Sequence, residues 1–359
     1  MKKTLVAIAA LSAISAFAQS SVTLSGVVDI RLAIGNGDNF NRTSLSSSGI
    51  SSSRLQFAGI EDLGGGLKAG FHLEAGVNPD DGTGAASSST NQGIGPFNAV
   101  SGQNALVRSG TQGLTFNRRS TLSVMGGFGE VRLGRDYTPH FWNHTYYDPF
   151  GTNGVASSMA LTGSAGGSTT VRASNSIGYF SPNFGGFSGQ IQTYFGENES
   201  NAAAPAGSNA GSGSSVRVGY AQGPINVGLA FARTTTSVST DVTTTNIGGS
   251  YDLGIVKLMG LYNKDAVSGR ADVNGWLFGV TAPLGSGTAK AAYSQTDNGV
   301  NGVAKQFGVG YVYDLSKRSA VYATLATVNN SNTSIALNGS STKVGGNSTG
   351  FDLGVKHSF

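Results

Sequence analysis

The chain has 359 residues, no cysteine, 55 glycines and a formal net charge of +4. Glycine at about twice its usual ~7% argues against a mainly helical protein, and without cysteine the fold has no disulfide. The charge falls to +2 once Lys2 and Lys3 leave with a leader peptide, which is too small to indicate nucleic-acid binding. Only 8 prolines and a regular alternation of aromatic residues also argue against a disordered chain.

Residues 1–18 have the three parts of a secretory signal peptide. Lys2 and Lys3 form its charged start, Leu5 to Ala18 its apolar stretch, and Ala16-Phe17-Ala18 its small-residue cleavage site. The apolar stretch is too short for a membrane-spanning helix, which needs roughly 20 residues. We therefore expect a signal peptide over 1–18 and a mature chain over 19–359 without a helical span.

The mature chain is a series of short segments in which apolar and polar residues alternate. These segments are joined alternately by compact turns and by long stretches rich in Gly, Ser, Asn and Thr. Leu63 to Gly66 is one of the turns, and Thr138 to Val171 is one of the long stretches. Seven turns and eight long segments join sixteen strands, an even number as in bacterial membrane barrels. The predicted strands are 21–34, 52–62, 67–77, 114–125, 130–137, 172–181, 187–196, 215–222, 225–234, 244–252, 255–264, 273–282, 287–296, 305–314, 319–328 and 348–359.

The last of these strands ends at the last residue, Phe359. Its side chains alternate, with Phe351 and Leu353 on one face and Asp352 and Lys356 on the other. Such an edge needs a partner, and the strand near Val22 to Ile30 can provide it. The sequence thus predicts an all-β fold: a 16-stranded antiparallel transmembrane β-barrel with short periplasmic turns and long extracellular loops. A secreted β-sandwich or β-solenoid adhesin would not require this regular alternation of turns and loops.

Four segments and the last residue carry a resemblance to a known family. They are 20–29 (SSVTLSGVVD), 53–69 (SRLQFAGIEDLGGGLKA), 127–135 (GFGEVRLGR), 175–182 (NSIGYFSP) and Phe359. They resemble the trimeric general porins of neisserial and Burkholderia-like Gram-negative bacteria. The resemblance implies a homotrimeric outer-membrane channel, a third loop folded into the lumen, a frequent preference for anions, and a role for Phe359 in the signal read by the barrel-assembly machinery. The family commonly has a basic residue where this chain has Ala58.

Strand alternation predicts which charged side chains face the lumen of such a barrel. If the neighbouring apolar residues face lipid, five basic residues point inward. Arginine and lysine along a narrow lumen favour anions over cations. We assign Asp148 to the constriction loop, where it would oppose these cations. Arg135 points outward unless a bulge intervenes. The five predicted pore-lining residues are Arg54, Lys68, Arg119, Arg132 and Arg172.

Two other patterns do not indicate a catalytic or metal site. His140 and His144 have helical ligand spacing, but Pro139 and the intervening residues indicate a loop, and no acidic third ligand follows. Asp80-Asp81-Gly82 reads as a turn. No Gly-x-Ser-x-Gly elbow in a strand-to-helix context and no convincing Ser/His/Asp set stands out, so we expect neither an enzyme nor a cofactor.

We therefore expect a passive channel for small hydrophilic solutes and anions, embedded in outer-membrane lipid. Two alternatives stay open: a channel that prefers organic anions, and a surface adhesin that uses the long loops.

Overall fold

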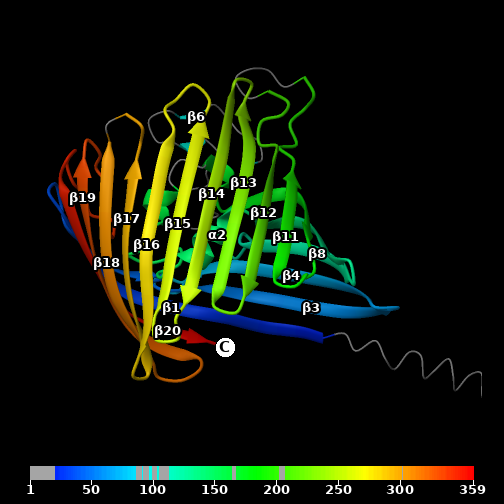
Figure 1. The fold of residues 1–359 in the computed structure, drawn as a ribbon, viewed down its shortest axis with the longest axis horizontal. Helices are drawn as coiled ribbons and strands as arrows, with labels where there is room; N and C mark the ends of the chain where they lie inside the picture. The colour runs from blue at the N-terminus through cyan, green and yellow to red at the C-terminus, as the bar shows by residue number, and fades with distance from the viewer. Residues whose placement is uncertain are drawn as a thin grey trace, which may run out of the picture.

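The computed structural model describes residues 21–85, 91, 97–98, 103–104, 113–163, 167–201, 207–300 and 302–359. The predicted signal peptide lies outside these residues. Sixteen antiparallel strands close into a barrel (Figure 1), which confirms the predicted fold class. They are β1(Ser21–Gly37), β3(Arg54–Gly64), β4(Leu67–Asn78), β8(Arg119–Gly126), β9(Gly129–Tyr137), β10(Arg172–Phe180), β11(Phe187–Tyr194), β12(Gly213–Gln222), β13(Ile225–Ser237), β14(Thr240–Asp252), β15(Lys257–Val267), β16(Val273–Leu284), β17(Gly287–Asp297), β18(Val303–Asp314), β19(Ser319–Ser331) and β20(Asn347–Ser358).

The barrel closes by pairing its first strand with its last. Val27 lies opposite Ser358 and Gly37 opposite Ser348, so the paired part of β1 lies further along the strand than predicted. At the end of the seam, Phe359 and Gly26 exchange backbone hydrogen bonds of 3.0 and 3.1 Å. Gly26 permits this approach, because a Cβ there would lie 2.5 Å from the Phe359 ring. The terminal strand therefore has no free edge.

The second wall strand is interrupted. Between the predicted strands 21–34 and 52–62 lies a short strand, β2(Arg42–Ser47), which pairs with residues 30–35 of β1. β3 then pairs with residues 21–27 of the same strand. The buried Asp29 carboxylate bridges the break by accepting the backbone N–H groups of Gly49, Ile50 and Ser51 at 2.8–3.0 Å. Because the Asp29 side chain accepts these three N–H groups, the wall can bend here without leaving them buried and unpaired. Three shorter strands, β5(Thr83–Gly84), β6(Phe97–Asn98) and β7(Gln103–Asn104), lie between β4 and β8.

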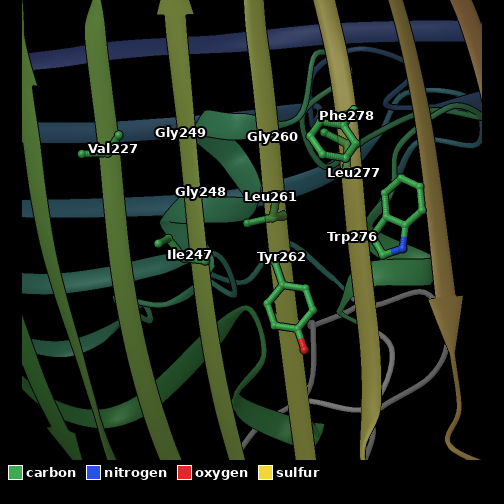
Figure 2. Close-up of a pocket in the computed structure, with 10 residues that line it drawn as sticks. All are labelled: Val227, Ile247, Gly248, Gly249, Gly260, Leu261, Tyr262, Trp276, Leu277 and Phe278. Atoms are coloured by element: carbon green, nitrogen blue, oxygen red, sulfur yellow. The ribbon is translucent and has the colours of Figure 1, made fainter.

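Residues alternate between the two faces of the wall as the sequence predicts. In β20, Leu353 is 50% exposed on the outside, whereas its neighbour Asp352 is fully buried on the inside. Across β13 to β16, the register places Val227, Gly249, Gly260 and Phe278 in one outward row. The two adjacent glycines leave a groove of about 620 Å³ in the outer surface, bordered by Tyr262 and other aromatic rings (Figure 2). The outer face is therefore apolar, as a lipid-facing wall requires.

The segment between β9 and β10 folds into the barrel. It contains two short helices, α2(Phe141–Tyr147) and α3(Met159–Thr162), and a 3₁₀ turn, η1(Gly167–Thr169). Figure 1 shows α2 within the ring of strands. Side chains of this inward loop form a buried apolar cluster with lumen-facing residues of β15 to β19, including Leu161, Leu277 and Val328. This arrangement confirms the inward third loop.

The expectation of a non-helical segment around His140 and His144 was wrong. Pro139 precedes α2 instead of interrupting it, and a proline is tolerated just before a helix because the first N–H groups have no intrahelical acceptor. None of the described helices has both the length and the apolar character needed to cross a membrane.

Candidate functional site: the narrowed lumen

Arg119 and Arg132, both predicted to line the pore, share two acidic side chains on the lumen wall. The Arg132 guanidinium donates to both carboxylate oxygens of Glu130 at 2.8 and 2.9 Å, and to Asp136 at 2.9 Å. Arg119 lies 3.7 Å from the Asp136 carboxylate and 4.0 Å from that of Glu130. Bidentate geometry of this kind holds a guanidinium in one orientation. Arg132 is thus held in one orientation, and Arg119 is held beside it by a 3.0 Å hydrogen bond from its Nε to Thr121 Oγ1.

A second group of cations surrounds Glu74 of β4. Arg118 Nε donates to its Oε1 at 2.5 Å, and the predicted Arg54 lies 3.7 Å from its Oε2. Arg118 also donates to the Tyr137 hydroxyl at 2.7 Å, which Arg172 reaches from β10 at 2.8 Å. The Arg172 guanidinium lies over the Tyr137 ring, 4.3 Å from its centroid. The aromatic face and hydroxyl of Tyr137 thus support this buried cation.

Arg135 joins these cations because the strand next to it is irregular. The pairing of β10 with β9 shifts between Ala173 and Ser176, where Asn175 has a positive φ of 54°. Arg135 donates to the Ser174 hydroxyl at 2.9 Å and lies close enough to Arg172 for charge repulsion. Strict alternation could not show this. By sequence alone, Arg135 could face inward only if a bulge was present, and the structure has such a bulge on the neighbouring strand, β10.

We define the arginine wall as Arg54, Arg118, Arg119, Arg132, Arg135 and Arg172. Among the described residues, these six guanidinium groups face three carboxylates, those of Glu74, Glu130 and Asp136. Three positive charges are therefore in excess on this side of the lumen.

Lys68 stands apart from the arginine wall. It is the second residue of β4, beside the β3–β4 turn, and its side chain is exposed. It has no ion-pair partner in the part of the chain that the structure describes. Its charge therefore lies at the turn end of the barrel, away from the narrow region.

Asp148 lies in the inward loop, but its carboxylate is enclosed. It accepts the N–H of Phe150 at 2.8 Å and both the N–H and the hydroxyl of Ser158, at 2.8 and 2.7 Å. The residue is 4% exposed, and burial raises the pKa of its carboxyl group to about 6. Lys290, on the wall behind the loop, is a nearby cation. That Asp148 produces an electric field across the lumen therefore stays a prediction. The structure shows its hydrogen bonds within the loop.

Besides Arg118 of the arginine wall, the lumen-facing Arg217 and Arg31 were missed by the sequence analysis. Arg217 of β12 is buried beneath α2, where its Nε donates to Asn143 Oδ1 at 2.7 Å. Arg31 of β1 forms an ion pair with Asp352. Both follow from alternation, because Val216 and Val218 flank the former and Ile30 and Leu32 the latter.

The inward loop holds its two histidines in a buried, neutral state. His140 Nδ1 lies 3.1 Å from Ser215 Oγ, and His144 Nδ1 lies 3.3 Å from Thr162 Oγ1. Burial lowers the pKa of His140 to about 3 and that of His144 to about 4. Within the described ranges, no group of three or more His, Cys, Asp or Glu side chains could hold a metal ion. The histidines thus belong to the packing of the loop.

Comparisons with known proteins agree with this architecture. The family model described as "Gram-negative porin" matches residues 4–333. Outer membrane porin protein 32 of Delftia acidovorans is 37% identical over 381 residues and covers 100% of both chains. An outer membrane porin protein of Bordetella pertussis is 26% identical and covers 90% of this chain and 93% of its own. A solved structure described as "Anion-selective porin from Comamonas acidovorans" has a TM-score of 0.81 and 36% identity, covering 95% of this chain and 100% of its own.

Proposed function

Because this chain belongs to the Gram-negative porin family, we propose that it forms an anion-preferring passive channel through the outer membrane. Family membership makes the chain an outer-membrane barrel and a channel rather than an enzyme. The anion preference is the part that we infer from the residues. Small hydrophilic solutes and anions would diffuse between the arginine wall and the inward loop.

The observation that carries the proposal is the excess of three cations on the arginine wall. Arginine keeps its charge at all relevant pH values, and its several donors bind carboxylate or phosphate without a fixed site. In a narrow lumen with low-dielectric walls, such charges lower the barrier for a hydrated anion and raise it for a cation. The solved relative from Comamonas acidovorans is described as anion-selective, which supports the same sign.

Three further expectations are part of the proposal, of which the first follows from the composition of residues 1–18 and the other two from the resemblance. They are the signal peptide over 1–18, assembly as a homotrimer, and recognition of the terminal residue Phe359 by the barrel-assembly machinery. The position of Phe359 supports the last of these, because the terminal residue completes the seam with Gly26. Conductance steps that occur in multiples of three would support the trimer, and independent single steps would contradict it.

A reversal potential measured across a planar bilayer in a KCl gradient tests the function. We expect a potential whose sign indicates that chloride crosses more readily than potassium. A potassium preference would overturn the proposed selectivity, and a protein that gives no stable stepwise conductance would favour the adhesin alternative.

A further inference from the structure

A cavity on the lumen side lies beside Val155 of the inward loop, outside the arginine wall. Its volume is about 340 Å³. β1 and β2 form one side of it, and the last long loop, between β19 and β20, forms the other. Arg42 and Gly339 on its border are exposed, so solvent reaches it. We call this space the vestibule pocket.

Two arginines supply the charge of the vestibule pocket. Arg42, at the start of β2, lies against Gly339, where an added Cβ would be 2.5 Å from Arg42 Nη1. Gly339 has a φ of +71°, so the close contact occurs at a position suited to glycine. Arg42 has no ion-pair partner among the described residues. The missing Cβ thus leaves space for a cation that is not neutralised.

Arg31 forms the inner end of the same surface. Its Nη1 binds the Asp352 carboxylate, but its Nε is buried and donates to none of the described residues. A buried guanidinium N–H without an acceptor is unfavourable, so Asp352 alone does not satisfy the hydrogen-bonding capacity of Arg31. Between the two arginines, the hydroxyls of Ser44 and Ser46 lie 3.1 Å apart on the same lumen face. These four side chains form a donor-rich surface.

The opposite side of the vestibule pocket is apolar. Ile335 and Leu337 of the last long loop line it, and Ala160 of α3 adds a third aliphatic surface. Leu337 is held in place because its N–H donates to Ser348 Oγ at 3.0 Å, while its side chain belongs to the buried cluster of the inward loop. An inorganic anion would use only the donor-rich side. A ligand that filled the cavity would need an anionic group and an apolar body.

We propose that the vestibule pocket binds amphipathic organic monocarboxylates, with the carboxylate on Arg42 and Arg31 and the apolar body against Ile335 and Leu337. The inference rests on the proposed anion channel, since a carboxylate must enter the lumen to reach the pocket. Binding here would concentrate such solutes beside the narrow region. It would also obstruct the current carried by smaller anions.

Benzoate is a suitable probe, because it combines one carboxylate with an apolar ring. Chloride current through the full-length channel is measured in a planar bilayer while benzoate is added, and acetate serves as a carboxylate without the apolar body. We expect saturable block by benzoate at concentrations where acetate has little effect. Arg42→Gln should weaken the apparent benzoate affinity roughly tenfold, the usual size of a lost charge-assisted hydrogen bond. Calorimetric titration of detergent-solubilised protein with benzoate gives a second measure that does not depend on conductance.

Lys343→Gln is the matched control. It removes one exposed positive charge from the same long loop without touching the vestibule pocket, so benzoate block should be unchanged. Any of three results would overturn the proposal. These are an equal loss of benzoate affinity in both variants, block by acetate equal to that by benzoate, and an unchanged benzoate affinity in Arg42→Gln. The reversal potential of the unmodified channel in the same membrane separates the two claims. An anion-selective channel without Arg42-dependent binding refutes the vestibule pocket alone, whereas a cation-selective channel refutes the proposed function.

Discussion

The backbone N–H of Val155, in the middle of the inward loop, donates to the carboxylate of Asp352 in the last strand at 2.9 Å. The same carboxylate pairs with Arg31 of the first strand and accepts from Asn338 Nδ2 at 2.8 Å. One buried acid therefore joins the barrel seam, the inward loop and the last long loop. The width of the lumen depends on such contacts, which act together with Gln306 Nε2 of β18 donating to the Ser157 carbonyl and with the packing of the loop helices against the wall.

Asp352→Asn tests this attachment. The amide retains the shape but loses the charge that balances Arg31, and removing one partner of a buried ion pair costs about 3 kcal/mol. We expect a lower free energy of unfolding in denaturant and a current that fluctuates between levels as the loop moves. Asp314→Asn, an exposed acid near the end of β18, is the control and should change neither. A quiet, wild-type current from Asp352→Asn would show that the loop is held by other contacts.

Gly248 is the second point at which the loop depends on the wall. A Cβ at this lumen-facing position would lie 2.1 Å from Tyr147 Cδ2 of α2, so Gly248→Ala should displace the helix. Overpacking of this kind costs about 1–3 kcal/mol. We expect a lower thermal unfolding temperature and an altered single-channel conductance.

Gly260→Ala provides the comparison for Gly248→Ala. Its Cβ would point to the outer face, at an ordinary contact distance of 3.6 Å from Phe278. Its unfolding temperature and conductance should stay close to wild type. If both substitutions had the same effect, the cause would be a general loss of backbone flexibility rather than contact with the loop.

Removal of a single wall cation should weaken the preference for anions. Arg54→Gln is suitable because its contact with Glu74 is loose, at 3.7 Å. A charge about 8 Å from a permeating ion in water contributes about 0.5 kcal/mol, favourable for chloride and unfavourable for potassium, so the chloride-to-potassium permeability ratio should fall by about a factor of five. Reversal potentials in a KCl gradient measure this ratio. Lys68→Gln, at the turn end, should have a smaller effect, and the reverse order would contradict the assignment of selectivity to the arginine wall.

Acid should loosen the inward loop. His140 and His144 have pKa values of about 3 and 4 in the docked loop, against about 6.5 when released, so the released loop binds more protons below pH 6.5. The free energy that holds the loop against the wall, called docking here, is therefore at its full value above pH 6.5 and decreases as the pH falls. Asp148 acts in the opposite sense, because its raised pKa of about 6 lets the docked loop bind a proton first.

The two histidines outweigh the single acid. At pH 5 they would cost about 4 kcal/mol together, while Asp148 would contribute about 1 kcal/mol in favour of docking. We expect steady single-channel currents at pH 7 and frequent changes of level near pH 5. His144→Gln should reduce this sensitivity, whereas His357→Gln, whose histidine is exposed near the end of the chain, should not. Currents that stay equally steady at both pH values would contradict this balance.

Deletion of Phe359 should affect assembly more than conduction. The residue completes the seam through two hydrogen bonds with Gly26 but lies at the turn end of the barrel, away from the arginine wall. We expect less protein in the outer-membrane fraction, measured by quantitative immunoblot, with normal conductance from the barrels that do insert. Phe359→Tyr keeps the aromatic end and should assemble normally. Normal amounts of the deleted protein in the membrane would exclude an assembly role.

Much of the fold could be predicted because strand alternation depends only on the backbone. Successive side chains point to opposite faces, so residues such as Phe351 and Asp352 reveal their sides of the wall without any knowledge of their neighbours. The same rule placed Arg54, Arg119 and Arg132 inward and could also have found Arg31 and Arg217. It failed at α2, where contacts with the lumen face of β13 to β15 stabilise a helix in a segment that reads locally as a loop.

The sequence by itself therefore determined the sixteen strands, their apolar outer face and the family to which the chain belongs. Only the tertiary structure decided which charges meet: Arg118 with Glu74, Arg135 with Ser174, and Asp148 with Ser158 rather than with the open lumen. The physical reason is the range of the interactions. Alternation is a local property of each strand, whereas an ion pair or a buried carboxylate depends on residues that lie on different strands or across a turn, and these meet only when the barrel closes and the loop folds inward.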